Sequence, residues 1–418
     1  MRDVVLIVAG LLVAGAVAWM LTASPVAPAS RPAASPAPTP AATGTAPAPP
    51  ADVLPPEPGA AWPGPGGGQA MTGIAPKRLA VPLALAWSFK TADAILSSPA
   101  VGDGRVFIGS DDGHVYALDL AGGKKVWAFK TGGAVQAGPL LLDGVVYVGS
   151  ADGFLYAIDA RSGGQKWRYE TGDKIIGGAN RAGLPGGRVG IIVASHDAKI
   201  HCADAATGRR VWAVEAGDAI NGGPSVAEGL AVAGSCDGKL YVVNIKTGRL
   251  SGTIDAGAYV GGSAALDGKE AYAGTMGNVL HRVDLATKEI FWTYDQATKA
   301  ILSSPALAAD RVVVGSQDQA VHCVDRLTGE GIWTFATRGQ VNASPVICDG
   351  KVVVGSGDGN LRVIDLAEGK EIWSYEIGAA IEASAAVAGG WVIVGASDGA
   401  VYAFGPQRAP AGEEGSGR

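Results

Sequence analysis

Short runs in which apolar and polar residues alternate, each ended by glycine or aspartate, fill the chain from about residue 79 to residue 405. A period of two is typical of β-strands, and the pair Asp112-Gly113 favours a tight hairpin because glycine takes positive φ without steric cost. The pattern therefore predicts a four-stranded unit of about 40 residues. In its first copy the expected strands are residues 95–101, 105–109, 114–119 and 125–130.

The same unit recurs along the chain, and a tryptophan marks most copies. Successive tryptophans are 40, 40, 45, 80, 41 and 40 residues apart, and the step of 80 leaves Gly252 at one equivalent position. These residues are Trp87, Trp127, Trp167, Trp212, Trp292, Trp333 and Trp373. Eight equivalent positions, with four antiparallel strands for each, predict an all-β, eight-bladed β-propeller.

Both ends of the repeat region are incomplete. The eighth copy, which begins at Gly395, has no tryptophan strand after it, whereas Leu83–Lys90 contains Trp87 and has no strands before it. We therefore expect Leu83–Lys90 to be the outermost strand of the last blade. The two ends of the repeat region would then share one sheet and close the ring, which removes exposed strand edges.

Each tryptophan ends a motif such as Ala157–Trp167, which has the form Ala-x-Asp-x-x-(Thr/Ser)-Gly-x-x-x-Trp. An indole buries roughly 150–250 Å² of surface. Placed between two blades over a small residue such as Ala117, it would hold one sheet against the next. We interpret the seven tryptophans as structural docking residues; stacking on a sugar or a cofactor is the alternative.

Candidate binding residues lie where the rigid repeat varies, because such positions can carry function. Every innermost strand begins with an apolar residue, a variable second place and two small residues, as in Val135-Gln-Ala-Gly-Pro139. Where the second place is polar, we expect its side chain to line a polar mouth of the central channel, together with basic residues in the loops just before the strands. This mouth would accept a peptide strand or a small ligand. The alternative is that these residues are solvated and have no specific role. The seven candidates are Gln136, Asn221, Asn342, Glu382, Lys174, Lys299 and Arg338.

Charge and cysteine content exclude several classes of protein. A net charge of -6 without a basic patch argues against a nucleic-acid partner. The four cysteines have no zinc-ligand spacing, and both free thiols and a single disulfide remain open. The pairs His201-Cys202 and His322-Cys323 lie on predicted strands, where neighbouring side chains point to opposite faces and cannot chelate one ion. We therefore predict no metal site and no catalytic residues.

The N-terminal region predicts export. Residues 1–22 contain the uncharged apolar run Val4–Leu21, which is typical of a signal anchor; a cleaved signal peptide is the alternative. Residues 23–76 are rich in alanine and proline and predict a disordered linker, and residues 406–418 predict a disordered tail. The propeller, residues 79–405, would lie on the periplasmic side, anchored in the cytoplasmic membrane, or secreted if the signal is cleaved.

The tryptophan motif and the Gly-Ser-x-Asp-Gly turn before it resemble the tryptophan-docking repeat of the pyrroloquinoline-quinone-like propellers over residues 79–405. The resemblance implies either the quinoprotein dehydrogenases or the non-catalytic, BamB-like branch. The dehydrogenases hold their quinone with a vicinal Cys-Cys disulfide, a stacking tryptophan and Ca²⁺. No two cysteines are adjacent in this chain. We therefore expect the non-catalytic branch, with neither pyrroloquinoline quinone nor calcium.

These inferences together predict an exported, membrane-tethered scaffold that binds protein partners in the cell envelope. A role in outer-membrane protein assembly fits the resemblance, and we expect a monomeric propeller that is not an enzyme. Two alternatives remain open. One is a quinone-dependent oxidoreductase or its degenerate relative, and the other is an extracytoplasmic ligand-sensing domain.

Overall fold

The computed structural model describes residues 50, 52–76 and 78–408. The predicted signal anchor, residues 23–49 of the predicted linker and the tail beyond residue 408 lie outside these residues. Within the described part of the chain, no helix is both long and apolar enough to cross a membrane.

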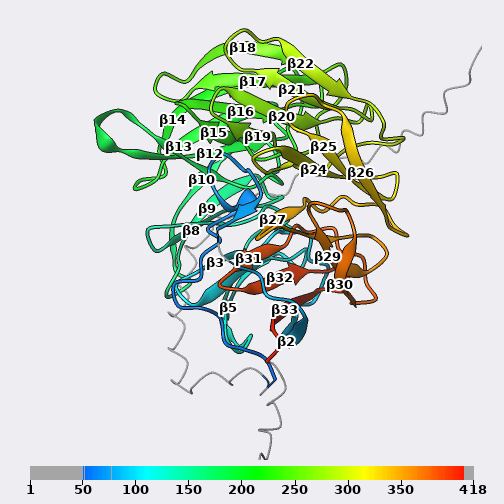
Figure 1. Cartoon of the computed structure of the whole chain (residues 1–418). Helices are drawn as coiled ribbons and strands as arrows, with labels where there is room; N and C mark the ends of the chain where they lie inside the picture. The colour runs from blue at the N-terminus through cyan, green and yellow to red at the C-terminus, as the bar shows by residue number, and fades with distance from the viewer. Residues whose placement is uncertain (1–49, 51, 77, 409–418) are drawn as a thin grey trace, which may run out of the picture. The chain divides into compact units, whose positions relative to one another are not determined.

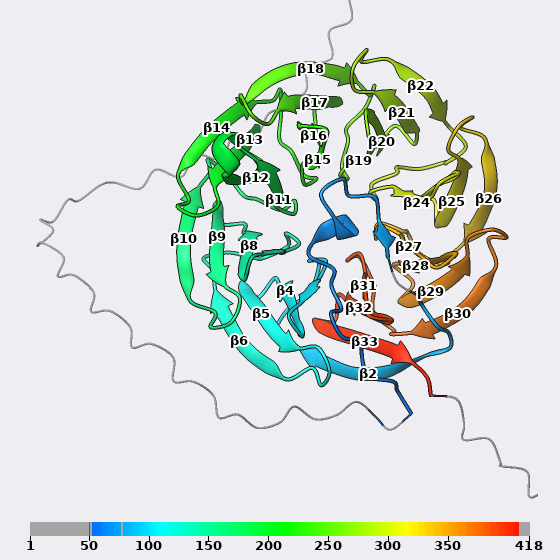
Figure 2. The ribbon, with the colours of Figure 1, turned by 60° about the vertical axis from the view of Figure 1, so that its left-hand side comes forward.

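Eight antiparallel sheets surround a central channel, as the repeat predicts (Figure 1; Figure 2). From the axis outwards, blade 1 consists of β3 (Ala100–Gly102), β4 (Arg105–Gly109), β5 (His114–Asp119) and β6 (Lys125–Lys130), and blade 2 of β7 (Leu140–Leu142), β8 (Val145–Gly149), β9 (Phe154–Asp159) and β10 (Gln165–Glu170). Blade 3 consists of β11 (Asn180–Gly183), β12 (Val189–Ser195), β13 (Lys199–Asp204) and β14 (Arg210–Glu215), and blade 4 of β15 (Ser225–Ala227), β16 (Leu230–Gly234), β17 (Lys239–Asn244) and β18 (Arg249–Asp255). A short 3₁₀ turn, η2 (Pro185–Gly187), fills the longer loop of blade 3.

Blades 5 to 8 follow the same order. Blade 5 consists of β19 (Ala265–Asp267), β20 (Glu270–Gly274), β21 (Leu280–Asp284) and β22 (Ile290–Tyr294), and blade 6 of β23 (Ala306–Leu307), β24 (Arg311–Ser316), β25 (Ala320–Asp325) and β26 (Gly331–Ala336). Blade 7 consists of β27 (Val346–Cys348), β28 (Lys351–Gly355), β29 (Asn360–Asp365) and β30 (Glu371–Glu376), and blade 8 of β31 (Ala386–Ala388), β32 (Trp391–Gly395), β33 (Ala400–Pro406) and β2 (Leu83–Lys90). The expected closure is confirmed, because β2 pairs antiparallel with β33, with Trp87 opposite Ala403.

The innermost strands are shorter than the sequence predicts. Residues 95–99 are not part of a strand, and β3 starts only at Ala100. Near the axis the blades converge, and residues before the inner strands form hydrogen bonds to neighbouring blades as well as to their own blade. The Ser97 hydroxyl, for example, donates to the carbonyl oxygen of Ala137 in blade 2 (3.0 Å).

The apolar core lies in the seams between neighbouring blades. In the first seam Phe107 and Trp127 of blade 1 pack with Val146 and Tyr156 of blade 2. Six indoles dock in the same way: each Nε1–H donates to a backbone carbonyl of the next blade, and the ring covers a glycine. The bonds run from Trp87 to Leu120 (2.8 Å), Trp127 to Ala160 (3.0 Å), Trp167 to Ala205 (2.9 Å), Trp212 to Ile245 (3.0 Å), Trp292 to Arg326 (3.1 Å) and Trp333 to Leu366 (2.9 Å). Trp373 instead packs edge-on against Phe404, with ring centroids 5.7 Å apart.

The seam between blades 4 and 5 uses a lysine where the others use a tryptophan. Gly252 stands at the tryptophan position, and Lys288 stands where the neighbouring repeats have the covered glycine. A Cβ atom added to Gly252 would lie 3.0 Å from Lys288 Cε, so the lysine stem occupies the space of the indole. Lys288 Nζ donates to the carbonyl oxygen of Leu285, the equivalent of the indole acceptor. The two exceptions to the repeat therefore compensate each other.

This compensation predicts a favourable coupling between Gly252→Trp and Lys288→Gly. Gly252→Trp alone should destabilise the ring, because the indole meets the lysine stem. The double variant restores the pair found in six other seams, so the coupling free energy should favour it by about 1–3 kcal/mol. Urea unfolding of the four members of the cycle measures this energy. Additive single effects would contradict the idea that one side chain replaces the other.

Two of the three buried histidines among the described residues, His201 and His281, are expected to make the seams sensitive to acid. His201 Nδ1 shares a hydrogen bond with the Tyr169 hydroxyl of blade 2 (2.9 Å). His281 Nε2 donates to the carbonyl oxygen of Ala256 in blade 4 (3.2 Å). Burial lowers the pKa of both imidazoles below the usual 6.5; for His201 it outweighs the opposing effect of Asp197. The folded state therefore favours the neutral rings, and their contribution is complete above pH 6.5 and lost as the pH falls below it.

We expect the free energy of unfolding to decrease between pH 7 and pH 5, and His281→Gln to reduce this slope. Urea unfolding across that range measures it. An unaltered slope in His281→Gln would show that its burial does not govern acid sensitivity.

The structure corrects the predicted linker over residues 52–76, which are ordered against the ring. Within this stretch the crossing segment, residues 62–75, passes over the end of the channel where the inner strands finish, here called the lower end (Figure 2). It contains η1 (Pro65–Gly67) and β1 (Ile74–Ala75), which pairs parallel with β27. Composition predicted disorder because so little apolar surface is present, but the crossing segment is held mainly by backbone hydrogen bonds.

The crossing segment meets the blades in chain order. Trp62 exchanges two backbone hydrogen bonds with Val101 of blade 1 (2.7 and 2.8 Å), and the Asn180 amide of blade 3 donates to the carbonyl oxygen of Gln69 (2.8 Å). Five further N–H groups of the inner strands donate to backbone carbonyl oxygens of the crossing segment. They are Leu141 to Pro63 (2.7 Å), Val226 to Gln69 (2.8 Å), Leu266 to Ala70 (2.8 Å), Leu307 to Thr72 (2.8 Å) and Ile347 to Gly73 (2.7 Å). Inner edges that would otherwise face the channel are thus paired.

Candidate functional site

The central channel contains a cavity of about 250 Å³. Its floor is the crossing segment, which contributes Trp62, Pro65 and Met71. Its wall is the set of small residues before the inner strands, and the second places of the repeat form its upper rim, at the end where those strands begin. The residues lining it include no Lys, Arg, Asp, Glu or His, so the cavity is uncharged, and its polar groups are the hydroxyls of five serines, the side-chain amides of Gln136 and Asn221, and the backbone.

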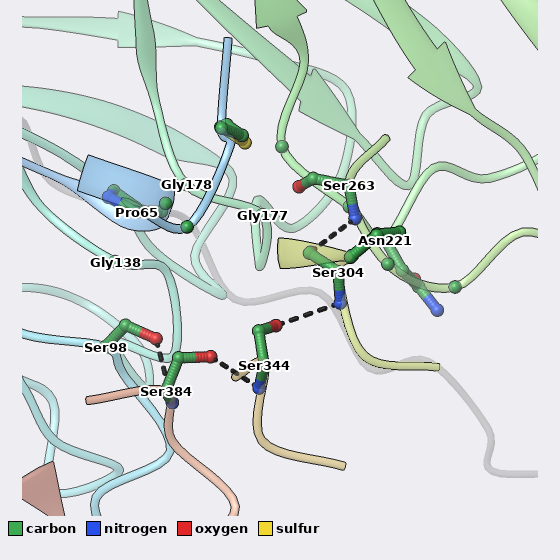
Figure 3. A pocket seen from close by; sticks show the side chains of 18 of the residues that line it. Pro65, Ser98, Gly138, Gly177, Gly178, Asn221, Ser263, Ser304, Ser344 and Ser384 are labelled. Carbon is green, nitrogen blue, oxygen red and sulfur yellow. Dashed lines mark hydrogen bonds between the residues drawn. The ribbon is translucent and has the colours of Figure 1, made fainter. Parts of the chain in front are cut away.

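Serines and glycines divide the wall into two halves (Figure 3). Four backbone N–H groups each donate to the serine hydroxyl of the next blade: Ser263 to Ser304 (3.0 Å), Ser304 to Ser344 (2.9 Å), Ser344 to Ser384 (2.9 Å) and Ser384 to Ser98 (3.2 Å). In the other half the equivalent residues include Gly138 and Gly178. A Cβ atom at either would lie 2.6 or 2.4 Å from Pro65 Cγ. The glycines therefore make room for the floor.

The predicted mouth residues form three groups instead of one cluster. Gln136 and Asn221 line the cavity. The Asn342 amide donates to the Glu382 carboxylate (2.9 Å), while Lys174, Lys299 and Arg338 are exposed in the loops before the inner strands. The backbone N–H groups of Arg338 and Lys174 donate to the carboxylates of Asp358 (3.0 Å) and Asp173 (2.6 Å).

Sequence reasoning missed the partners of the mouth residues. The Gln136 amide donates to Asp111 (3.0 Å), the Gln317 amide donates to Asn342 (3.1 Å), and the Asn221 amide donates to the Tyr259 hydroxyl. Asp111 and Gln317 occupy the x place of the Gly-Ser-x-Asp-Gly turn or its looser copy. Variation at that place was visible in the sequence and would have pointed to them.

Electrostatics at the rim follow from these contacts. Burial raises the pKa of the Asp111 carboxyl, as do the nearby carboxylates of Asp93 and Asp112, and the hydrogen bond from Gln136 opposes the rise. Asn221 Oδ1 is buried and has no hydrogen-bond partner among the described residues. The rim therefore offers amide and carboxyl groups for hydrogen bonding.

The cavity residues do not fit a quinone held with Ca²⁺. Calcium takes six to eight oxygen ligands, usually with carboxylates among them, and the cavity lining contains none. Throughout the described part of the chain, no group of three or more His, Cys, Asp or Glu side chains could hold a metal ion. Cys202, Cys236 and Cys323 lie in three different blades and carry free thiols.

Solved structures of known proteins share the fold. BamB from Moraxella catarrhalis is 20% identical, with a TM-score of 0.66 over 78% of this chain and 100% of that one. A quinohemoprotein alcohol dehydrogenase from Comamonas testosteroni is 15% identical, with a TM-score of 0.70 over 84% and 81%. A europium-containing methanol dehydrogenase is 14% identical, with a TM-score of 0.67 over 84% and 98%. At these identities the likeness establishes the fold alone.

Sequence comparison identifies the family. Among curated proteins no significant match is found. A family model described as outer membrane protein assembly factor BamB matches residues 84–294 and 275–409, which together cover most of the chain and all eight tryptophan-docking positions. The chain therefore belongs to this BamB family of pyrroloquinoline-quinone-like repeat propellers.

Proposed function

We propose that this propeller is a non-catalytic scaffold that binds protein partners in the cell envelope and takes part in outer-membrane protein assembly. The observation that carries the proposal is the division of the channel. Its lower end is spanned by the crossing segment, and its upper end presents a polar rim and the loops around it. An uncharged cavity that does not fit Ca²⁺ supports binding over redox catalysis.

The tether and the compartment belong to the same proposal. An apolar N-terminal run followed by an alanine- and proline-rich stretch suits a propeller held off the outer face of the cytoplasmic membrane. A cleaved signal would release it into the same compartment. Either arrangement leaves the loops of the upper end accessible to envelope proteins.

Site-specific crosslinking in living cells tests the proposal. A photoreactive residue at Lys174 or Arg338, in the upper-end loops, should capture proteins of the outer-membrane assembly machinery. The same residue at Arg249, exposed at the start of β18, is the matched control and should not. Failure to capture any protein reproducibly from the upper end would overturn the scaffold.

The quinone-dependent alternative has its own test. Purified full-length protein is incubated with pyrroloquinoline quinone and Ca²⁺, and reduction of an artificial dye is followed with alcohols and sugars as substrates. We expect no activity above that of the cofactor alone. Dye reduction that depends on the protein would favour an oxidoreductase over the scaffold.

A further inference from the structure

The seam between blades 5 and 6 departs from the repeat at two linked positions. The first is the residue that stands opposite the tryptophan position on the neighbouring strand of the same blade. It is small or apolar in the other blades but is Arg282 in blade 5. The residue whose carbonyl accepts the indole is apolar in the other docked seams but is Arg326 in blade 6. For the first position the equivalents are Ala117, Ala157, Cys202, Val242, Cys323, Val363 and Ala403. For the second they are Leu120, Ala160, Ala205, Ile245, Leu366 and Leu285, of which Leu285 accepts from Lys288.

Both guanidinium groups are satisfied by neighbouring protein groups. Arg282 forms a two-pronged ion pair with Glu270 (Nε–Oε2 3.1 Å, Nη2–Oε1 2.5 Å). Arg326 bonds the Tyr272 hydroxyl (2.9 Å), the carbonyl oxygen of Ala308 (3.1 Å) and the Asp267 carboxylate. Because their donors are used internally, the arginines position other groups and do not themselves bind an outside anion.

What the arginines position is a rigid turn that carries an exposed leucine. Arg282 Nη1 donates to the carbonyl oxygen of Leu327 (3.2 Å), and the Asp325 carboxylate accepts the N–H groups of Leu327 (2.9 Å) and Thr328 (2.8 Å). The Leu327 residue is 75% exposed. These bonds fix the backbone of the turn, so the place from which the Leu327 side chain projects is set before binding, and this lowers the entropy cost of ordering the turn.

A second exposed apolar side chain lies beside this turn. The Arg282 guanidinium carbon is 4.9 Å from the centroid of the Phe291 ring, and Phe291 is 49% exposed on β22. The outer strands β22 and β26 are neighbours on the rim of the ring (Figure 2). Arg282 thus holds Leu327 of blade 6 and Phe291 of blade 5 in one patch, here called the leucine patch.

The groove next to the leucine patch is acidic. It is lined by five carboxylates and three basic side chains, which gives a net charge of -2 from 5 minus 3. Its residues are Asp267, Glu270, Asp284, Asp310, Asp325, Lys269, Arg282, Arg326, Ala309 and Leu327. Three of the carboxylates are paired with arginines of the protein: Glu270 with Arg282, Asp267 with Arg326, and Asp310 with Arg311. The remaining charged side chains of the groove are Asp284, Asp325 and Lys269, which leaves a net charge of -1 from 2 minus 1.

We propose that the leucine patch is a docking surface for a partner protein whose face carries an apolar pocket flanked by lysine or arginine. Leu327 enters the pocket, Phe291 packs beside it, and the carboxylates of Asp284 and Asp325 pair with the flanking cations. Arg282 and Arg326 are positioning residues. This inference rests on the proposed scaffold function but concerns a surface away from the upper end of the channel.

Crosslinking from the leucine patch in the full-length protein tests this inference. A photoreactive residue at position 327 should capture a protein through a segment in which apolar residues stand beside Lys or Arg, as mass spectrometry of the crosslink shows. The same residue at position 250, where Leu250 is 45% exposed on β18, is the matched control. Equal capture at both positions, or a crosslinked segment without basic residues, would overturn the inference.

Affinity measurements with the captured partner then test the mechanism. Leu327→Asp should weaken binding at least tenfold, Leu250→Asp less than twofold, and rising salt should weaken the wild type, because exposed charges contribute. Unchanged melting temperatures exclude misfolding. Capture of a second copy of this chain would contradict the partner named here. Capture at Lys174 or Arg338 without capture at position 327 would remove this surface and leave the scaffold intact; capture at none would remove both.

Discussion

A chain that starts at residue 91, and therefore lacks β2, is expected to lose its cooperative unfolding transition. The strand supplies the outer edge of blade 8 through its ladder with β33, and Trp87 docks on blade 1 through the carbonyl oxygen of Leu120 (2.8 Å). The ring of Trp87 also covers Gly123, where an added Cβ atom would lie 2.5 Å from it. Losing a buried indole alone costs about 3–5 kcal/mol, and the truncation removes the whole ladder as well.

Calorimetry and circular dichroism measure the outcome, and a chain that starts at residue 79 is the matched control. It lacks the crossing segment but keeps β2, so it separates the closing strand from everything before it. The open edge of β33 should also cause association of the shorter chain, because an unpaired strand edge templates pairing between molecules. Equal melting temperatures for the two chains would show that the ring does not need β2.

The repeat could be predicted because its signal is carried by side chains. The spacing of the indoles gives the number of blades, and the missing outer strand of blade 8 has one candidate, the strand around Trp87. The crossing segment is different. Thr72 and Gly73 are held through their carbonyl oxygens, and backbone groups leave no trace in the residue type. Its visible signals were a single tryptophan, Trp62, in an alanine- and proline-rich stretch and the glycines that face Pro65.

Positions that break the repeat come in pairs that only the three-dimensional structure joins. Gly252 is compensated by Lys288, which lies 36 residues later in the next blade. Gly138 makes room for Pro65, and Arg282 meets the turn that follows Arg326. In the sequence of one repeat, each of these residues is an isolated departure from the repeat pattern, because its partner lies in another blade or in the crossing segment. The mouth residues illustrate the same limit, because their partners Asp111 and Gln317 belong to a different turn of the repeat.

A chain that starts at residue 79 should itself be markedly less stable than the full-length protein while keeping the closed ring. Six inner-strand N–H groups lose their partners in the crossing segment, and each such bond contributes about 0.5–1.5 kcal/mol. The buried ring of Trp62, only 2% exposed in the full-length protein, is lost with the segment. We therefore expect the free energy of unfolding to fall by roughly 3–9 kcal/mol from these six hydrogen bonds, with the loss of the indole in addition. Urea unfolding of both chains measures this difference.

The point variant Trp62→Ala separates packing from hydrogen bonding within the crossing segment. It removes the indole but leaves the backbone bonds to Val101, so it should cost about 3–5 kcal/mol. Leu54→Ala, at a residue that is 41% exposed in the same stretch, is the matched control and should change stability little. The shorter chain should also admit solvent from the lower end, because the floor of the cavity is gone, and amide exchange of Leu266 and Leu307 should then accelerate. Equal stability and equal amide exchange of the two chains would show that the crossing segment neither stabilises the ring nor closes the lower end of the channel. The proposal that partners bind at the upper end would then lose this support.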